Sequence, residues 1–470
     1  MGYRRNKTAV AYRGFIQKLI FDQFERQGEI LRKKTFKRGI HPLHEIHQGK
    51  SLSEHCAIRP FVAETVCIPM DMHIGAPSAP CVKKGQLVKL GEVIAEPVGG
   101  IGIPVHASVS GKVTEVALRQ QMQAKHSMCI TIQNDFQDEW VELNAHEDPF
   151  ACTPDEIIEA VKQAGICGMG GACFPTHVKM KLPEGKEVDT IILNGAECET
   201  FLTADHRLML ERPRLVINGL LLAMQAMDVQ KGFIAIEDNK MDAIRAIKQE
   251  IRADEKVKVV ILKAKYPQGG EKQLIDAVIA QQVPSGGLPM DAHCVVLNVG
   301  TAASIYEAVA MGKPLIERVT TVTGCVKQPD NLLLRIGTSF IDAINECGGY
   351  AKEPGKIFAG GSMTGICAPT DTVSAGKGNN GIVVLDQEEA KFAQTTACIR
   401  CGKCLDACPI GLNPMRLKDL CDRKDLDVAV NECVMDCMFC GSCSYVCPAH
   451  RWLMDSIKIG RNELNARRAR

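Results

Sequence analysis

Long hydrophobic runs, aromatic residues and net charge are all scarce in this sequence of 470 residues. No apolar stretch is long enough to span a bilayer, so we expect no transmembrane helix. The net charge is +1 and aromatic residues make up 5%, which argues against a nucleic-acid binder that neutralises phosphates or stacks on bases. The first residues lack the apolar core of a secretory signal, so we expect the reducing cytoplasm as the location.

Cysteine, in contrast, is abundant, with 22 residues. In a reducing compartment these are packed thiols or metal ligands rather than disulfides. Two motifs share the spacing C-x2-C-x2-C-x3-C-P, "CIRCGKCLDACP" and "CMFCGSCSYVCP". In two-cluster ferredoxins, three thiolates of such a motif bind one 4Fe–4S cluster and the fourth binds the other cluster.

These motifs predict two 4Fe–4S clusters and a protein that carries electrons. The first cluster would be held by Cys398, Cys401, Cys404 and Cys447, and the second cluster by Cys437, Cys440, Cys443 and Cys408. Zinc is the alternative, but zinc usually takes separated C-x2-C pairs, which cysteines packed this closely do not form. Clusters also need an electron source, and a flavin fits because it exchanges two electrons with a hydride donor and one with a cluster.

The remaining chain divides into segments of different periodicity. Residues 1–34 form an extension whose apolar positions have helical spacing, either an amphipathic helix for a partner or lipid, or a segment with no fold of its own. Residues 35–135 alternate in short runs broken by Gly and Pro, and their two halves resemble a lipoyl-type barrel-sandwich domain. The hairpin between the halves, "PVGGIGIP", holds no lysine, so a swinging-arm function is not supported. Lys112 is then expected to be a solvated strand residue.

Residues 150–320 alternate continuous apolar strands with amphipathic helices, which predicts an α/β domain with a parallel sheet. Near its start, "GICGMGGACFPTHVK" at 165–179 is either an ordinary turn or a loop that lets a phosphate or flat ring approach the backbone. Residues 321–388 predict strand, turn, strand and helix, a small α+β unit. The cluster motifs occupy the last segment, 389–470.

Taken in order, these segments resemble the RnfC family, the peripheral subunit of the Rnf electron-transport complex. The resemblance runs from about Thr35 to Gly460 and is carried by the two cluster motifs and by "TFKRGIHP", "HIGAPSAPCVKKG", "VHASVSGKV", "GMGGACFPTHVK", "LNGAECE", "YPQGGEKQLI" and "LNVGTAASIYEAV". Residues 165–310 are also similar to the flavin- and NADH-binding subunit of respiratory complex I. The resemblance implies a multidomain α/β protein with a barrel-sandwich domain, an FMN/NADH-binding domain, a β-grasp-like SLBB domain and a ferredoxin-like helical domain.

The same resemblance implies which residues bind flavin and nucleotide. The backbone at Gly168, Gly170, Gly171 and Ala172 would face FMN, Phe174 would flank the nicotinamide, and Lys179 would offer a cation to phosphate. Asn194, Glu197 and Glu199 would hydrogen-bond the flavin or nucleotide, and Glu271, Asn298 and Thr301 would complete the pocket, with Glu199 and Glu271 in catalytic roles. Cys173 and Cys198 lie inside these motifs, where packed thiols are favoured over groups that tune the flavin.

The function implied by the resemblance is a subunit of an ion-translocating NADH:ferredoxin oxidoreductase. Hydride would pass from NADH to FMN, and single electrons would pass through the two clusters. Its partners would be the Rnf membrane subunits and ferredoxin, at the cytoplasmic face of the membrane. One alternative is a soluble RnfC-like reductase that feeds a corrinoid protein, a folate-linked reductase or an amino-acid reductase. Another is a cluster relay with a vestigial flavin pocket, against which the intact glycines and acidic residues argue.

Overall fold

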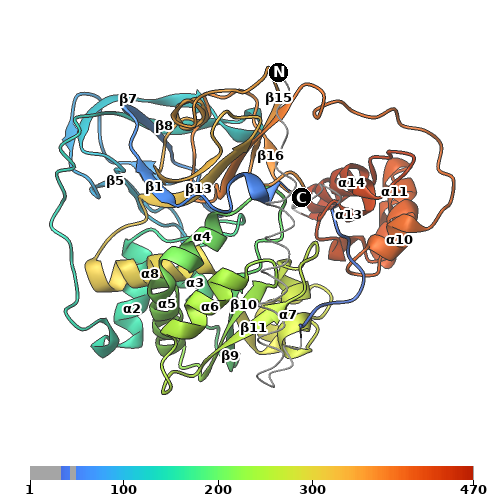
Figure 1. The fold of residues 1–470 in the computed structure, drawn as a ribbon, viewed down its shortest axis with the longest axis horizontal. Coiled ribbons are helices and arrows are strands. Elements are labelled where there is room, and N and C mark those ends of the chain that lie inside the picture. Colours follow the sequence, from blue (N-terminus) through green and yellow to red (C-terminus); the bar gives the residue numbers. More distant parts are fainter. Residues whose placement is uncertain (1–32, 43–48, 469–470) are drawn as a thin grey trace, which may run out of the picture.

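The computed structural model describes residues 33–42 and 49–468, and the helix considered for the extension lies outside them. Figure 1 shows an α/β region at the bottom, two β regions above it, and a helical region at the right that is joined by a long extended segment. The multidomain fold expected from the sequence is therefore confirmed.

The α/β region is built on a four-stranded parallel sheet with the order β11-β10-β9-β12. Its strands are β9 (Thr190–Gly195), β10 (Lys231–Glu237), β11 (Val257–Leu262) and β12 (Cys294–Asn298). Its helices are α2 (Pro154–Gln163), α3 (Thr176–Met180), α4 (Ala204–Glu211), α5 (Pro213–Ala226), α6 (Met241–Glu250), α7 (Glu271–Ile279) and α8 (Val299–Met311). The chain moves outward from β9 to β11 and then returns to the other side of β9 as β12. The strand order therefore reverses between β9 and β12, which is where open parallel sheets bind ligands.

Helices α5 and α8 pack against each other at an unusually short distance. A Cβ on Gly219 of α5 would lie 1.7 Å from the carbonyl oxygen of Ala302 in α8. Only glycine permits this contact, because any side chain would push the two helices apart. The contact fixes the first turn of α8 at the end of β12, beside the point where the strand order reverses.

The first β region has two small sheets, as the barrel-sandwich resemblance implied. One has the order β2-β8-β7-β4 and the other β3-β5-β6. The strands are β2 (Thr65–Pro69), β3 (Ala79–Pro80), β4 (Leu87–Val88), β5 (Val93–Glu96), β6 (Val105–His106), β7 (Gly111–Gln120) and β8 (His126–Asn134). Val66, Ile68, Ile130 and Ile132 are fully buried between the sheets. Lys112 is exposed on β7, as expected.

The second β region has a six-stranded mixed sheet with the order β1-β14-β13-β17-β15-β16. Its elements are β1 (Ile58–Phe61), β13 (Glu317–Gly324), β14 (Asp330–Arg335), α9 (Phe340–Glu346), β15 (Pro354–Ala359), β16 (Ile366–Cys367) and β17 (Gly381–Asp386). The expected order of strand, turn, strand and helix is present as β13, β14 and α9. Strand β1, however, comes from the segment assigned to the first β domain and pairs in parallel with β14. Local periodicity identifies a strand but not its distant partner.

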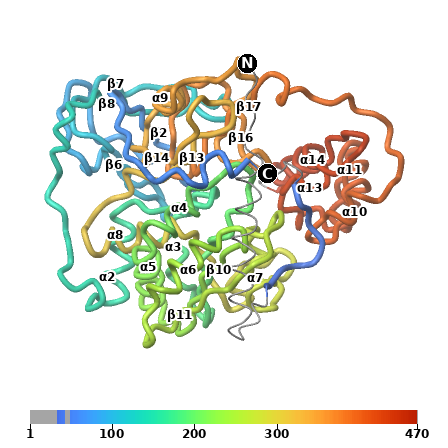
Figure 2. The backbone as a smooth tube through the Cα atoms, viewed as in Figure 1, coloured from blue at the N-terminus to red at the C-terminus, as the bar shows by residue number. Residues whose placement is uncertain are grey.

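The helical region carries both cysteine motifs. Its helices are α10 (Lys403–Ala407), α11 (Pro414–Asp422), α12 (Leu426–Asn431), α13 (Ser442–Tyr445) and α14 (Leu453–Arg468). Figure 2 shows the described N-terminal segment in blue, passing between this region and the α/β region. Lys34 pairs with Leu262 at the end of β11, and Ile40 pairs with Tyr266. The segment that precedes the barrel-sandwich strands therefore contributes to the contact between two later domains.

Candidate functional site

The glycine-rich loop forms a narrow hairpin whose tip faces outward. The Gly168 N–H donates to the Phe174 carbonyl at 2.8 Å, and the Cys173 N–H donates to the Gly168 carbonyl at 3.1 Å. Gly171 has φ +112°, and a Cβ there would meet no protein atom within 4 Å. Gly170, Gly171 and Ala172 are exposed, and helix α3 begins directly after the loop. The tip therefore presents bare backbone to open space, as a loop that receives a ligand must.

The loop is attached to the first turn of α8. The Met169 N–H donates to the Thr301 hydroxyl at 2.9 Å. Asn298, the last residue of β12, accepts from the Gly300 N–H at 2.8 Å and donates to Asp205 Oδ2 at 2.7 Å. Burial, followed by the charge of Glu197, raises the pKa of Asp205 to about 7. The loop, Asn298 and Thr301 thus meet at the topological switch between β9 and β12.

The two acidic residues after β9 have different environments. Glu197 is buried, and its two oxygens accept the N–H groups of Asp205 at 2.7 Å and His206 at 3.3 Å, at the start of α4. Glu199 instead accepts the N–H groups of Met363 and Thr364, each at 3.0 Å. Burial raises the pKa of the Glu199 carboxyl. Glu197 therefore stabilises α4, whereas Glu199 faces the second β region.

A second group of predicted residues lies beside the loop. The Lys179 Nζ pairs with Glu271 Oε1 at 3.0 Å, which joins α3 to the first turn of α7. Asn194 at the end of β9 donates to the Gly269 carbonyl at 2.8 Å. These residues surround the carboxyl ends of the strands, but they do not line the large cavity next to the loop. Phe174 is half-buried in the neck of the hairpin.

A cavity of about 450 Å³ lies where the loop meets the two β regions. Of the predicted residues, Gly170, Gly171, Ala172 and Glu199 line it. His73 also lines it, and both of its ring nitrogens are buried without a hydrogen-bond partner among the described residues. Burial lowers the pKa of His73 to about 4, so the ring is neutral. Unpaired buried polar atoms are rare in native proteins, and a polar cofactor in this cavity would supply the missing partners. The residues present therefore fit FMN.

Three buried cations hold this site together, and sequence reasoning did not find them. Lys377 donates to the Gly165 carbonyl at 2.7 Å, and Arg318 donates to the Met169 carbonyl at 3.2 Å. Lys50 donates to the carbonyls of Glu197 and Glu199, both at 2.8 Å, and of Leu202 at 2.6 Å. Burial lowers the pKa of Lys377 to about 8. Lys50 lies far from the site in sequence and in no recognisable motif, so only the fold reveals its role.

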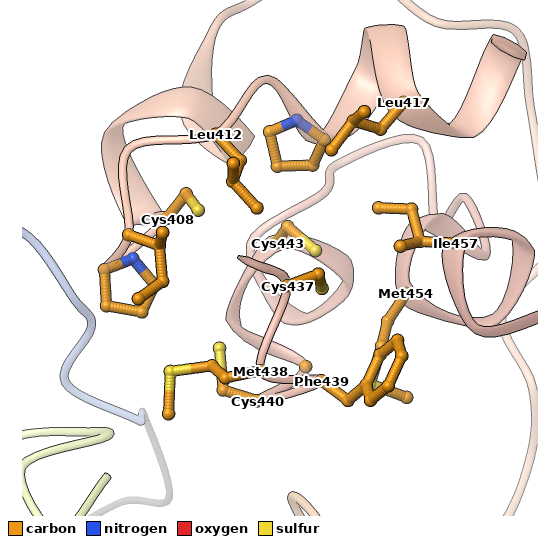
Figure 3. Close-up of a pocket in the computed structure, with 14 residues that line it drawn as sticks. Cys408, Leu412, Leu417, Cys437, Met438, Phe439, Cys440, Cys443, Met454 and Ile457 are labelled. Carbon is orange, nitrogen blue, oxygen red and sulfur yellow. The ribbon is translucent and has the colours of Figure 1, made fainter. Parts of the chain in front are cut away.

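Four thiols surround a small cavity in the helical region (Figure 3). They belong to Cys408, Cys437, Cys440 and Cys443. Cys408 comes from the other motif, and its charge is one of the causes, after burial, that raise the pKa of Cys437 to about 11. Within 33–42 and 49–468, no group of three or more His, Cys, Asp or Glu side chains is arranged to hold a metal ion as it stands. Thiols spread around a cavity suit a cubane, whose irons occupy separate corners, better than one tetrahedral zinc.

The thiols assigned to the first cluster lie in a more open place. Cys398 and Cys401 are exposed, and Cys404 and Cys447 are half-buried. Burial raises the pKa of Cys404, and the charge of Cys447 adds to this effect, so the two thiols are neighbours. The structure thus brings together the thiols of the second set and the pair Cys404 and Cys447 of the first set, and the assignment of all eight to clusters stays a prediction.

The fold and the site define a protein that couples a flavin to iron–sulfur clusters. Family comparison agrees, because residues 34–137 match the RnfC barrel-sandwich hybrid domain and 161–307 match the Nuo51 FMN-binding domain. Residues 319–366 match the SLBB domain and 390–448 match the 4Fe–4S dicluster domain. FMN and 4Fe–4S clusters are therefore the cofactors of this chain.

The particular family follows from full-length relatives. The C subunit of the Na⁺-translocating ferredoxin:NAD⁺ oxidoreductase complex of Acetobacterium woodii is 45% identical over 92% of this chain and 98% of its own length. Its counterpart in the proton-translocating complex of Clostridium ljungdahlii is 44% identical over 84% and 85%. The counterpart in the ion-translocating oxidoreductase complex of Rhodobacter capsulatus is 38% identical over 94% and 85%. The chain belongs to the RnfC family, the C subunits of ion-translocating ferredoxin:NAD⁺ oxidoreductase complexes. None of its described helices is both long and apolar enough to cross a membrane.

Proposed function

We propose that this chain exchanges electrons between NADH and ferredoxin at the cytoplasmic face of the membrane, as the peripheral subunit of an ion-translocating complex. The observation that carries the proposal is the exposed backbone at Gly170 and Gly171, which lines the cavity beside the topological switch. Bound FMN would supply the exchange between a two-electron hydride donor and one-electron clusters. The partners would be ferredoxin and the membrane subunits of the complex.

Within this proposal, the loop residues accommodate the cofactor and the flanking residues orient it. The absence of side chains at Gly168, Gly170 and Gly171 leaves room for a flat ring and for N–H groups that face it. Asn298 and Thr301 hold the loop in place through α8. Phe174 would flank the nicotinamide, and Lys179, positioned by Glu271, would offer its cation to phosphate.

The acidic residues have separate roles in this proposal. Glu199 reaches the cavity, so its carboxyl is the one placed to contact a bound ring or nucleotide. Glu271 is half-exposed at the first turn of α7, where it can hydrogen-bond an incoming nucleotide. Asn194 and Glu197 contribute by holding the backbone after β9, because their side chains bond to Gly269 and to the start of α4.

The packing of the helical region favours one order of electron transfer. The Tyr266 hydroxyl donates to the Cys440 carbonyl at 2.8 Å. Met438 packs closely on Gly270, since a Cβ on that glycine would lie 2.6 Å from the Met438 methyl group. The second cluster would therefore lie against the α/β region. Cys398 and Cys401 are exposed, so the first cluster would lie toward solvent. Electrons from NADH would pass through the second cluster to the first cluster and then to the partner.

The partner would meet the first cluster at its exposed loop. Ile399, between two predicted ligands, is 69% exposed, and Arg400 beside it is exposed as well. Thr396 and Arg451 join this loop to the segment that follows Cys447, so Arg451 adds a second cation near the cluster. An apolar centre with basic neighbours suits an acidic iron–sulfur protein, because complementary charge steers brief redox encounters.

A glycine substitution tests the flavin site. Gly171→Val should lose bound FMN and NADH:ferricyanide activity while its clusters stay reducible by dithionite, because the branched side chain would fill the space needed by the ring. The matched control is Gly185→Val, since Gly185 also has positive φ (+77°) and open space around its Cβ but lies outside the site. Both variants carry backbone strain on the order of 1–3 kcal/mol. Normal FMN content and NADH oxidation in Gly171→Val would show that the loop is only a turn.

A further inference from the structure

Two cysteines, Cys167 and Cys173, lie on the two facing sides of the neck of the glycine-rich loop, two positions out of register. Cys167 forms an antiparallel bridge with Pro175, and the next hydrogen bonds of the neck join Gly168 to Phe174 and to Cys173. The two side chains lie near enough for a hydrogen bond from Cys167 to lower the pKa of Cys173, and the Cys167 thiol also lies 4.0 Å from the Met72 carbonyl. The loop that would receive the flavin is therefore closed at its base by a dithiol.

The two thiols differ in access and charge. Cys167 is completely buried, whereas Cys173 is half-buried and lines the 450 Å³ cavity. The hydrogen bond from Cys167 lowers the pKa of the Cys173 thiol, and the buried cations Arg318 and Lys377 act in the same direction against burial. The same hydrogen bond and burial raise the pKa of Cys167. Cys173 is thus the accessible nucleophile, and Cys167 is the protonated thiol behind it.

The backbone of Cys173 is also unusual. Its φ is +52°, a left-handed conformation that is strained for a residue with a side chain. Its sulfur packs on the second β region, where a Cβ on Gly378 would lie only 2.4 Å away. A strained residue inside a candidate site is a reason to look for a chemical role, and packing alone does not account for a thiol paired with another thiol.

We propose that Cys167 and Cys173 form a reversible disulfide that controls flavin binding. The Cys173 thiolate attacks a small disulfide, forms a mixed disulfide and releases one thiolate. The sulfur of Cys167 then attacks the Cys173 sulfur, forms the Cys167–Cys173 bond and releases the second small thiol, which takes up the Cys167 proton. Two protein thiols are oxidised by two electrons, and one disulfide is reduced to two thiols.

The disulfide changes the site because it moves the loop. Bond formation draws the Cys173 sulfur from its contact with Gly378 toward Cys167, and the backbone between Gly168 and Phe174 must follow. The exposed glycines at the tip then face the cavity differently, so FMN binds less tightly. This second half of the proposal rests on the proposed flavin site, whereas formation of the disulfide does not.

The test uses the full chain with its clusters, kept anaerobic in mixtures of reduced and oxidised glutathione. Both cysteines fall in one tryptic peptide, residues 163–179, so the disulfide appears as a peptide lighter by two hydrogens that resists alkylation. We expect this peptide in the oxidised mixtures, together with a several-fold loss of bound FMN that dithiothreitol reverses. Cys167→Ala should trap glutathione on Cys173. Cys173→Ala should bind the same amount of FMN before and after oxidation. Cys152→Ala, which removes a buried cysteine outside the pair, should lose FMN on oxidation as the unaltered chain does.

Two results would overturn the proposal. An unmodified, alkylatable 163–179 peptide in the most oxidised mixture, with exposed Cys81 already modified, would show that the pair does not form a disulfide. A complete disulfide with unchanged FMN content would show that it does not control the site. A chain that forms the disulfide but binds no FMN even when reduced would refute the proposed flavin site instead, so the two failures can be distinguished.

Discussion

The two cysteine motifs have the same spacing and almost opposite surroundings. Cys440, in the second motif, is buried, and its carbonyl accepts a hydrogen bond from Tyr266 of the α/β region. Asp436, next to that motif, accepts from Ser285 at 2.7 Å. In the first motif Cys398 and Cys401 are exposed, and only its end, at Ala407 and Cys408, is buried. A repeated ligand pattern thus predicts two equal clusters, while domain packing gives the thiols of the two motifs different burial; the proposed inner and outer clusters follow from that difference.

The largest expected effect is the loss of ferredoxin reduction in variants that lack one cluster each. Cys440→Ala should remove the second cluster and Cys401→Ala the first cluster, because each loses a thiolate ligand. Ferredoxin reduction should fall to background in both variants. With NADH as the only reductant, electron paramagnetic resonance should detect a reduced cluster in Cys401→Ala but not in Cys440→Ala, although dithionite reduces the remaining cluster in both. A first cluster reduced by NADH in Cys440→Ala would reverse the proposed order.

The next effect concerns loss of iron. An iron chelator should strip the first cluster several times faster than the second cluster, because the loop with Cys398 and Cys401 is open to solvent and needs no domain separation. Mössbauer spectra recorded during anaerobic incubation would follow the two clusters separately. Equal rates would contradict the difference in exposure, and faster loss from the second cluster would invert it.

A smaller effect is expected at the partner surface. Ile399→Asp places a negative charge beside the first cluster and should raise the KM for an acidic ferredoxin about tenfold, as loss of an apolar contact of about 1–2 kcal/mol would. Ile459→Asp in α14 is the control, because the two isoleucines are 69% and 68% exposed. Ferricyanide reduction should stay the same in both. If the two variants affect ferredoxin equally, the partner does not recognise the loop around Ile399.

The smallest effect tests the contact between Tyr266 and the second motif, on which the proposed inner position of the second cluster rests. Tyr266→Phe leaves the buried Cys440 carbonyl without its hydrogen bond and should cost about 1 kcal/mol of unfolding free energy in urea. It should also alter the resonance signal of the second cluster. Tyr350→Phe removes a hydrogen bond of 2.9 Å to Asp371 in the second β region and should leave that signal unchanged. A second-cluster signal unaltered by Tyr266→Phe would weaken the structural distinction between the clusters.

Much of the architecture was predictable because it depends on short-range patterns. Continuous apolar runs predicted β9, β10 and β11 as buried parallel strands, and amphipathic spacing predicted α2 and α6. The lysine-free hairpin and the strand, turn, strand and helix order from residue 317 also follow from local sequence. The pairing of strand β1 with β14 was not predictable, because the two strands lie about 270 residues apart along the chain.

The candidate site was predictable only in part. The glycine-rich loop could be recognised from the sequence, because Gly168, Gly170 and Gly171 have no side chain to keep a ligand from the backbone. The different environments of Glu197 and Glu199 could not be predicted, because they depend on contacts with the start of α4 and with the loop at 363–364. Lys50, Arg318 and Lys377 are ordinary cations in the sequence, and only their buried hydrogen bonds to loop carbonyls show that they support the site.

The sequence by itself determined the chemistry of this protein: the spacing of thiols sets the kind and number of clusters, and the glycines set where backbone can be approached. Ligand geometry and conformational freedom are local properties, so they can be deduced from residues a few positions apart. Only the tertiary structure decided which thiols are buried, which carboxylate reaches the cavity, and that Cys167 and Cys173 lie near each other. Those outcomes depend on burial and on contacts between distant segments, which arise when the domains pack together.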